Sequence, residues 1–180
     1  MPEGYKIRDQ EGSYFMTFTV VDWIDVFSRK RYCDILLESF TYCRKEKGLL
    51  LSAYVIMSNH VHVIAKSSAG ELSELVGSIK KFISKKIITS IKEEPESRRE
   101  WMLHRFEYAA KYTKRNEQYQ FWTHDNHPEG IFTPQFFDQK LHYIHMNPVR
   151  AGIVELPEHY LYSSARNYAG LNALIEIDLD

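Results

Sequence analysis

The stretch that most constrains this chain is residues 54–66, an apolar and β-branched run interrupted by two histidines. His60 and His62 are two positions apart, and in a β-strand such residues project from the same face. Val61 and Val63 then project from the opposite face, where they can pack on a core. Two parallel imidazoles on a rigid strand are a ready pair of metal ligands. A His-x-His pair is common by chance, so its meaning depends on the rest of the chain.

The residues before and after this stretch predict alternating strands and helices, because apolar residues recur with period two or with helical spacing. The first expected elements are a strand at 13–21 and a helix at 29–47, with Ser28 as its N-cap and a left-handed Gly48 after its end. A strand at 49–57 and a turn at Ser58 and Asn59 lead into the histidine strand. Two further helices are expected, at 73–92 and 98–113.

The last third of the chain predicts a short strand at 120–123, a polar turn at 124–130 and one more helix. Thr133 is the expected N-cap of that helix and Pro134 its first residue. The helix should end at Asn147, because a proline disfavours helical conformation in the residue before it. A tyrosine-rich tail after Pro157 is expected to pack over the sheet.

Charge is distributed unevenly along a chain whose formal net charge is −1. Residues 78–115 carry 11 Lys and Arg against 5 Asp and Glu, whereas the rest of the chain carries 12 against 19. The net charge by itself argues against a nucleic-acid partner, but a basic segment within an acidic chain favours one. The alternative interpretation is a helix face that is merely exposed to solvent. Four lysines fall outside the apolar stripe of the expected 73–92 helix and are available to a phosphate backbone: Lys80, Lys81, Lys85 and Lys86.

No apolar run approaches the roughly 18 residues of a membrane span, and the first residues lack the layout of a signal peptide. We therefore expect a cytoplasmic protein with no membrane partner. There is no internal repeat or low-complexity linker, so residues 1–180 are expected to form a single domain with a helical, basic insertion at about 93–118.

Tyr143 and Asn147 are four residues apart on the last expected helix and so share one face. A phenol beside a metal ion can act as a nucleophile, because nearby positive charge favours the phenolate. The amide oxygen of Asn147 is a candidate third metal ligand. His142 and His145 compete for that role, and a buried core tyrosine is the alternative interpretation of Tyr143.

Taken together, these motifs resemble a known family. Residues 58–62 look like the HUH motif (His-hydrophobic-His) of single-tyrosine transposases, and residues 143–154 are similar to the tyrosine signature of the REP-associated tyrosine transposases within that insertion-sequence-200-like superfamily. Shorter matches occur at 121–122, 126–128 and 157–164. The resemblance extends from Tyr14 to Gly170, with both motifs in the expected order.

The resemblance implies a ferredoxin-like α+β fold, with an antiparallel sheet that carries the histidines, helices on one face and the tyrosine helix lying across from it. It implies a divalent ion, Mg²⁺ or Mn²⁺, held by His60, His62 and a polar residue of the tyrosine helix, for which Asn147 is the candidate. By ligand softness alone the imidazoles suit Zn²⁺ equally well.

The same resemblance implies a DNA transposase that cuts single-stranded DNA at hairpins through a 5′-phosphotyrosine link to Tyr143, without ATP. The four lysines and Arg150 would hold the DNA backbone, and exposed aromatic residues would stack on unpaired bases. Two alternatives are a catalytically silent hairpin-binding protein and a small zinc hydrolase in which Tyr143 is structural. The sequence leaves a monomer and a homodimer open.

Overall fold

The computed structural model describes residues 6–113 and 118–179. Its secondary structure follows in chain order: β1 (Ser13–Thr19), α1 (Lys30–Glu46), β2 (Leu49–Ile56), β3 (His60–Ser67), α2 (Leu72–Glu93), α3 (Arg99–Tyr112), β4 (Glu129–Ile131), α4 (Pro134–Arg150) and α5 (Ala165–Tyr168), with 3₁₀ turns η1 (Val21–Trp23), η2 (Val26–Ser28) and η3 (Pro157–His159).

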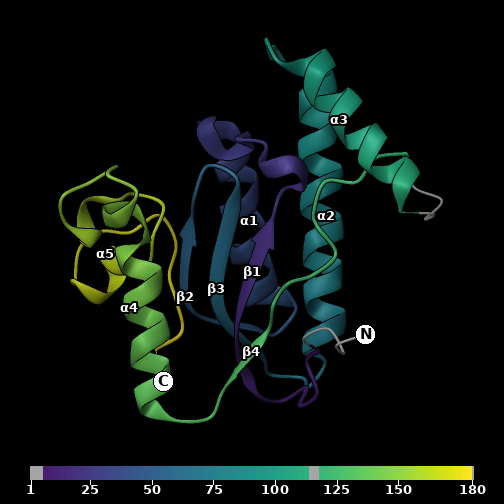
Figure 1. Cartoon of the computed structure of the whole chain (residues 1–180). Coiled ribbons are helices and arrows are strands. Elements are labelled where there is room, and N and C mark those ends of the chain that lie inside the picture. The colour runs from purple at the N-terminus through teal and green to yellow at the C-terminus, as the bar shows by residue number, and fades with distance from the viewer. Residues whose placement is uncertain (1–5, 114–117, 180) are drawn as a thin grey trace.

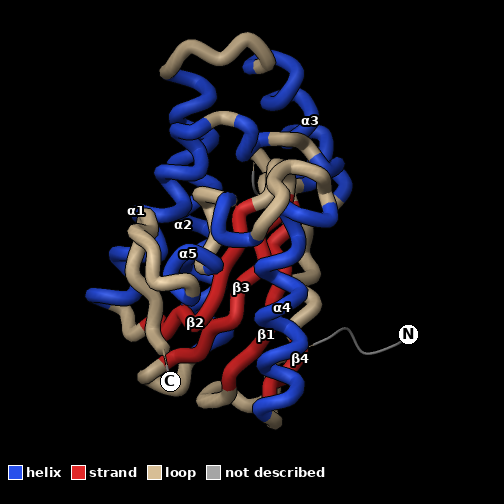
Figure 2. The backbone as a smooth tube through the Cα atoms, turned by 90° about the vertical axis from the view of Figure 1, so that its left-hand side faces the viewer, coloured by secondary structure: helices blue, strands red, loops and turns tan. Residues whose placement is uncertain are grey.

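The four strands form one antiparallel sheet in the order β2-β3-β1-β4. Helices α1 and α2 lie on one side of this sheet and α4 on the other (Figure 1). The predicted α+β class with an antiparallel ferredoxin-like sheet is confirmed. Figure 2 shows α4 in front of the sheet.

Alternation along the strands divides the interior into two cores. The larger core, under α1 and α2, takes Met16 and Phe18 from β1 and Val61 and Val63 from β3. The smaller core, under α4, takes the residues that face the other way. The prediction that His60 and His62 share a face opposite the valines is confirmed, and that face is the one α4 covers.

The helix cap expected at Ser28 is wrong. α1 begins at Lys30 with Arg29 at the N-cap position and no side-chain cap. Ser28 is instead the last residue of η2, the 3₁₀ turn before the helix. Its hydroxyl donates to the Asp25 carbonyl oxygen over 2.7 Å, so it is not available to cap α1. The predicted left-handed Gly48 is confirmed, with φ +70°.

The short strand predicted at 120–123 is also wrong. Phe121 and Trp122 are buried, and only an isolated bridge pairs Trp122 with Val20. The added strand is β4, which overlaps the end of the predicted polar turn at 124–130, and it pairs with β1. Aromatic composition indicated burial correctly here, but burial against the α2 side of the sheet does not require strand pairing.

α4 starts as predicted, since the Thr133 side chain accepts a hydrogen bond from the Phe136 amide over 3.2 Å. It does not stop at Asn147 but continues through Pro148 to Arg150. Near the end of a helix a proline removes only one hydrogen bond. The following turn supplies others, since Ile153 donates to the Pro148 carbonyl oxygen.

The C-terminal segment covers the outer edge of β2. Residues 162 and 164 exchange backbone hydrogen bonds with β2, and the Tyr160 hydroxyl donates to the Ile56 carbonyl oxygen over 2.6 Å. Near the other end of the strand, Asp178 binds Leu51 through both its backbone and its carboxylate, and Arg44 pairs with that carboxylate. The predicted packing of the tyrosine-rich tail is confirmed.

The insertion expected at about 93–118 consists of the end of α2, the turn that follows and α3, while residues 114–117 lie outside the described part of the chain. α3 packs on α2 and on η1. Within residues 6–113 and 118–179, none of the helices is both long and apolar enough to cross a membrane.

Candidate active site

The two predicted histidines and the predicted tyrosine meet where α4 crosses the sheet. The His60 and His62 ring centroids are 4.8 Å apart, and the Tyr143 ring lies 5.2 Å from that of His62. Phe15 stacks on His62 at 5.4 Å and meets Tyr143 edge-on at 5.8 Å. His62 and Tyr143, which are 81 positions apart in the sequence, therefore belong to one cluster of rings.

Each histidine is oriented by a polar neighbour. His60 Nδ1 lies 2.8 Å from the Asn59 side-chain oxygen, which can only accept, so Nδ1 carries the proton and Nε2 of a neutral ring carries the lone pair. The Asn59 amide is held in turn, because its nitrogen donates to Asp25 Oδ1 over 3.1 Å. Thr17, opposite His62 in the sheet, places its hydroxyl 2.8 Å from His62 Nδ1.

Burial favours the uncharged form of both rings. It lowers the pKa of His60, and with smaller effects of His60 and Lys140 it lowers the pKa of His62 to about 3. A neutral imidazole offers the lone pair that a metal ion needs. A polar neighbour on Nδ1 is the usual outer-shell partner of a ligating histidine. The donor pair therefore fits a divalent ion bound through Nε2.

A third protein ligand would have to be of another kind. The described residues contain no group of three or more His, Cys, Asp or Glu side chains placed to hold a metal ion. Asn147, half-buried on α4 one turn beyond Tyr143, is an amide that meets this requirement by residue type. His142 is exposed on the same helix.

Cationic side chains flank Tyr143, which is 39% exposed. The Arg150 guanidinium carbon lies 5.4 Å from the centre of the Tyr143 ring. Lys140, one turn before Tyr143, lies 4.5 Å from the centre of the Phe15 ring and pairs with Glu129. Lys140 was not among the residues predicted from the sequence, although its spacing of three from Tyr143 places it on the same helix face.

His145 is part of the packing between α4 and the C-terminal segment. Its Nε2 lies 2.9 Å from the Ser164 hydroxyl, and its ring meets Tyr168 at 5.1 Å. Burial, with a smaller effect of His142, lowers the pKa of His145 to about 4. These contacts assign His145 to the stability of the fold.

We expect His145 to make the protein less stable in acid. Its pKa is lower in the folded state, so between pH 6.5 and about 4 the unfolded chain binds a proton that the folded chain does not. The free energy of unfolding should therefore fall as the pH falls through this window, by roughly 2–3 kcal/mol from this residue. Urea unfolding at several pH values, with chelator present, measures the effect.

In His145→Gln the acid-dependent loss should be smaller by that amount, because His60 and His62 titrate in both proteins. His159→Gln, at an exposed histidine of η3, is the matched control and should keep the wild-type slope. Parallel curves for the wild type and His145→Gln would contradict the assignment.

The predicted basic residues of α2 do not join this cluster, because α2 covers the opposite side of the sheet. Lys80 is bonded to the Thr123 carbonyl oxygen and to Asn126, and with Lys81 it lines a groove of about 580 Å³ beside residues 119–128. Lys81, Lys85 and Lys86 are exposed, and Lys86 lies 4.0 Å from Glu38.

One further residue beside the site was not selected from the sequence. Trp23 is 64% exposed, and its ring meets His60 edge-on at 6.0 Å. Both Trp23 and Asp22 have φ +54°, a left-handed conformation that costs about 1–2 kcal/mol per residue other than glycine. Nothing in the sequence signals this strained turn, because a bulky residue such as tryptophan is rarely found in the left-handed region.

Comparisons with known proteins bear on the family and the fold. The family described as "Transposase IS200 like" matches residues 14–123, more than half of the chain. A solved structure described as that of the REP-associated tyrosine transposase bound to a REP hairpin is similar over 100% of this chain and 92% of its own, with TM-score 0.66 and 16% identity. A search of curated proteins found no match.

Proposed function

Because this chain belongs to the family of IS200-like transposases, we propose that it cuts and rejoins single-stranded DNA at hairpins, with Tyr143 as the nucleophile. The observation that carries the proposal is the contact of Tyr143 with the two-histidine pair, 5.2 Å between the Tyr143 and His62 rings. A nucleophile beside a pair of metal ligands is what metal-assisted phosphoryl transfer requires.

In the proposed step, Tyr143 Oη attacks a phosphorus atom of the DNA backbone. The Oη–P bond forms, the bond from phosphorus to the 3′ oxygen breaks, and the DNA is left with a 5′-phosphotyrosine and a free 3′-hydroxyl. The phenol gives up its proton and the leaving 3′ oxygen takes one. Attack by a 3′-hydroxyl on the phosphotyrosine reverses the step and joins strands, so no ATP is needed.

His60 and His62 would hold the divalent ion, Mg²⁺ or Mn²⁺, and we propose Asn147 as the third protein ligand. When bound, the ion would neutralise charge on the scissile phosphate and orient it. The chain's own contribution is to keep both rings neutral by burial and to fix their orientation through Thr17 and Asn59. Arg150, beside the Tyr143 ring, would bind a neighbouring phosphate.

The proposed site needs only one copy of the chain. His60, His62 and Tyr143 approach one another through α4 lying on the sheet of the same chain, so a homodimer is not required to assemble them. The hairpin as substrate rests on the structure of similar fold, which is described as bound to a REP hairpin.

We also propose that Lys81, Lys85 and Lys86 contact a duplex stem away from the cutting site. Replacing all three with alanine should weaken hairpin binding at low salt and reduce the slope of log affinity against log salt by about 2–3, since each phosphate contact contributes roughly 0.7–0.9. Fluorescence anisotropy over a salt series measures this slope. Lys45 and Lys47, exposed at the end of α1, are matched controls; an equal slope in both variants would contradict the proposal.

The experiment that tests the function is detection of the covalent intermediate. Purified protein is incubated with labelled imperfect hairpins that carry single-stranded flanks, taken from the DNA beside the gene, with Mg²⁺, with Mn²⁺ or with chelator. We expect a denaturant-stable protein–DNA band that needs metal. Tight binding without such a band would favour a catalytically silent hairpin-binding protein instead.

A further inference from the structure

The turn at Asp22 and Trp23 presents a large aromatic ring to solvent next to His60. Trp23 is 64% exposed and meets the His60 ring edge-on at 6.0 Å, so most of the residue is open to solvent beside the histidine. A tryptophan that only stabilises the fold does so by burying its large apolar ring. This one contributes nothing to either core of the fold.

The backbone under Trp23 is held in a conformation that the residue itself disfavours. Asp22 and Trp23 both have φ +54°, and a bulky residue in the left-handed region is a genuine outlier. Such strain persists only where the surroundings enforce it, and it clusters at binding sites. An exposed ring on an enforced backbone is therefore a feature that folding alone does not explain.

Several contacts enforce the turn. Asp22 pairs with Arg105 of α3 over 2.8 Å, and the Trp23 carbonyl oxygen accepts a hydrogen bond from the Asn59 amide over 3.3 Å. Asn59 is the same residue that orients His60. The Trp23 turn and the first histidine are thus fixed to each other through one side chain.

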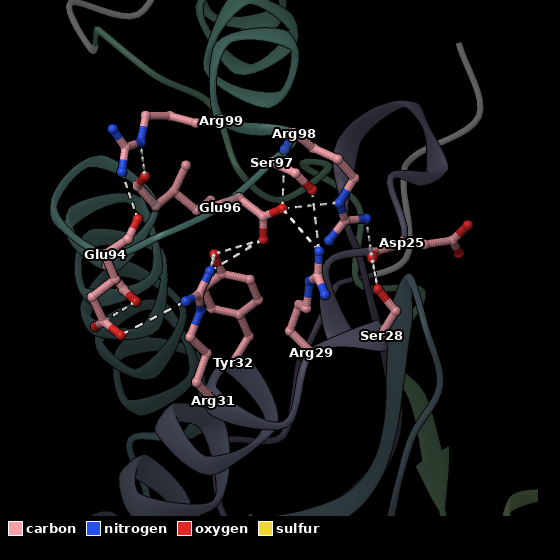
Figure 3. A network of polar contacts seen from close by, with 12 residues as sticks. Asp25, Ser28, Arg29, Arg31, Tyr32, Glu94, Glu96, Ser97, Arg98 and Arg99 are labelled. Atoms are coloured by element: carbon pink, nitrogen blue, oxygen red, sulfur yellow. Dashed lines mark hydrogen bonds and ion pairs between the residues drawn. The ribbon is translucent and has the colours of Figure 1, made fainter.

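An ionic network around the buried Glu96 carboxylate holds the segment that follows. Glu96, whose side chain is fully buried between α2 and α3, pairs with Arg29, Arg31 and Arg98 (Figure 3). Arg98 also donates to the Asp25 carbonyl oxygen over 3.0 Å. Burial opposes ionisation of Glu96, but hydrogen bonds and charge from Arg98 outweigh it and lower the pKa to about 2. Residues 25–31 are therefore tied to the predicted insertion.

We propose that Trp23 is a stacking platform for one unpaired base of single-stranded DNA, next to the phosphate that Tyr143 attacks. The inference rests on the proposed function and adds a binding site to it. The rings of Trp23, His60, His62 and Tyr143 contact one another in that order, so a strand whose phosphate lies over the histidines brings a neighbouring base to Trp23. Every base has a flat face, so such a platform positions DNA with little sequence preference.

The platform also gives the insertion a role. α3 contributes Met102 and Phe106 to the main core. In addition, its Arg105 and the Glu96 network before it anchor the turn that carries Trp23. α3 thus helps to fix the backbone that carries Trp23.

Abasic scanning tests the proposal. In the single-stranded flank of a hairpin that the wild type binds, each nucleotide in turn is replaced by an abasic one, and affinity is measured by anisotropy. We expect one position at which the wild type loses roughly 10-fold or more. In Trp23→Ala the affinity for intact DNA should be lower by a similar factor, and the abasic loss at that position should disappear. Trp23→Phe should restore much of both.

Trp101→Ala is the matched control, because Trp101 is 53% exposed on α3. It should keep the wild-type abasic profile. If Trp23→Ala does not fold, Trp23→Leu replaces it, since leucine is bulky and apolar without an aromatic face. The same abasic profile in the wild type and in the Trp23 variant would overturn the platform, and so would a wild-type profile without a sensitive position.

The two levels of the proposal fail differently. A wild type that binds no hairpin and forms no covalent band would remove the proposed function itself. A wild type that binds and cuts, with an abasic profile that Trp23→Ala leaves unchanged, would remove only the platform. A loss of Mn²⁺ affinity without a change of the profile would make Trp23 a shield for His60 and would also overturn it.

Discussion

Tyr143→Phe should abolish the covalent protein–DNA band and leave hairpin binding intact. The substitution removes only the hydroxyl oxygen, so the ring contacts with His62, Phe15 and Arg150 persist. Loss of a nucleophile typically lowers the rate of the covalent step by roughly 10⁴-fold or more. Denaturing gels with labelled DNA, together with mass spectrometry of the adduct peptide, measure the effect.

The matched control is Tyr42→Phe, at a tyrosine that is 53% exposed on α1, on the other side of the sheet. It should form the band at the wild-type rate. A band that persists in Tyr143→Phe would mean that another residue is the nucleophile and would contradict the proposed mechanism. Loss of hairpin binding in Tyr143→Phe would instead point to a role of the hydroxyl in holding DNA.

Replacing either histidine should remove metal binding together with cutting. His60→Ala and His62→Ala each delete one imidazole of the pair, and a change in an outer-shell partner alone typically costs 10–100-fold in metal affinity. We therefore expect Mn²⁺ affinity to fall by roughly 100-fold or more in either variant, and by about 10-fold in Thr17→Val, which loses the contact with His62 Nδ1. Calorimetry and Mn²⁺ resonance spectra measure binding without DNA.

His142→Ala is the control for this pair, because His142 is exposed on α4 beside Tyr143. It should bind Mn²⁺ as the wild type does. His62 is only 5% exposed, so the unfolding midpoint of each variant is measured as well. Unchanged Mn²⁺ affinity in folded His60→Ala and His62→Ala would sink the metal site. Tight zinc binding with hydrolysis that survives in Tyr143→Phe would favour the zinc hydrolase.

The parts of the site that repeat a regular spacing were predictable from the sequence. Period two in β3 places His60 and His62 on one face, and helical spacing places Tyr143 and Asn147 on another. That the two faces meet depends on α4 crossing the sheet, which came from the family resemblance and not from the spacing. The strands at 49–57 and 60–66 were predictable for the same reason, since their apolar pattern agrees with their burial.

What escaped prediction depends on contacts between distant segments. Thr17 faces His62 only because of the register between β1 and β3, which the sequence alone does not encode locally. Trp23 and Asp22 adopt a conformation opposed to their own preference, enforced by Asn59 and Arg105. The prediction of a strand at 120–123 was wrong because aromatic residues are enriched both in strands and in buried segments that are not strands. Local propensity gives way to tertiary context in each case.

The covering of β2 by the C-terminal segment has a consequence for solubility. An open edge strand is a template on which another chain can extend a sheet, and this is a common route to aggregation. Here the donors and acceptors on the outer side of β2 are taken up by residues 162, 164 and 178. At the opposite edge β4 is only three residues long, which is too short to template a stable addition. Both edges of the sheet are therefore poor templates for β-strands of a neighbouring molecule.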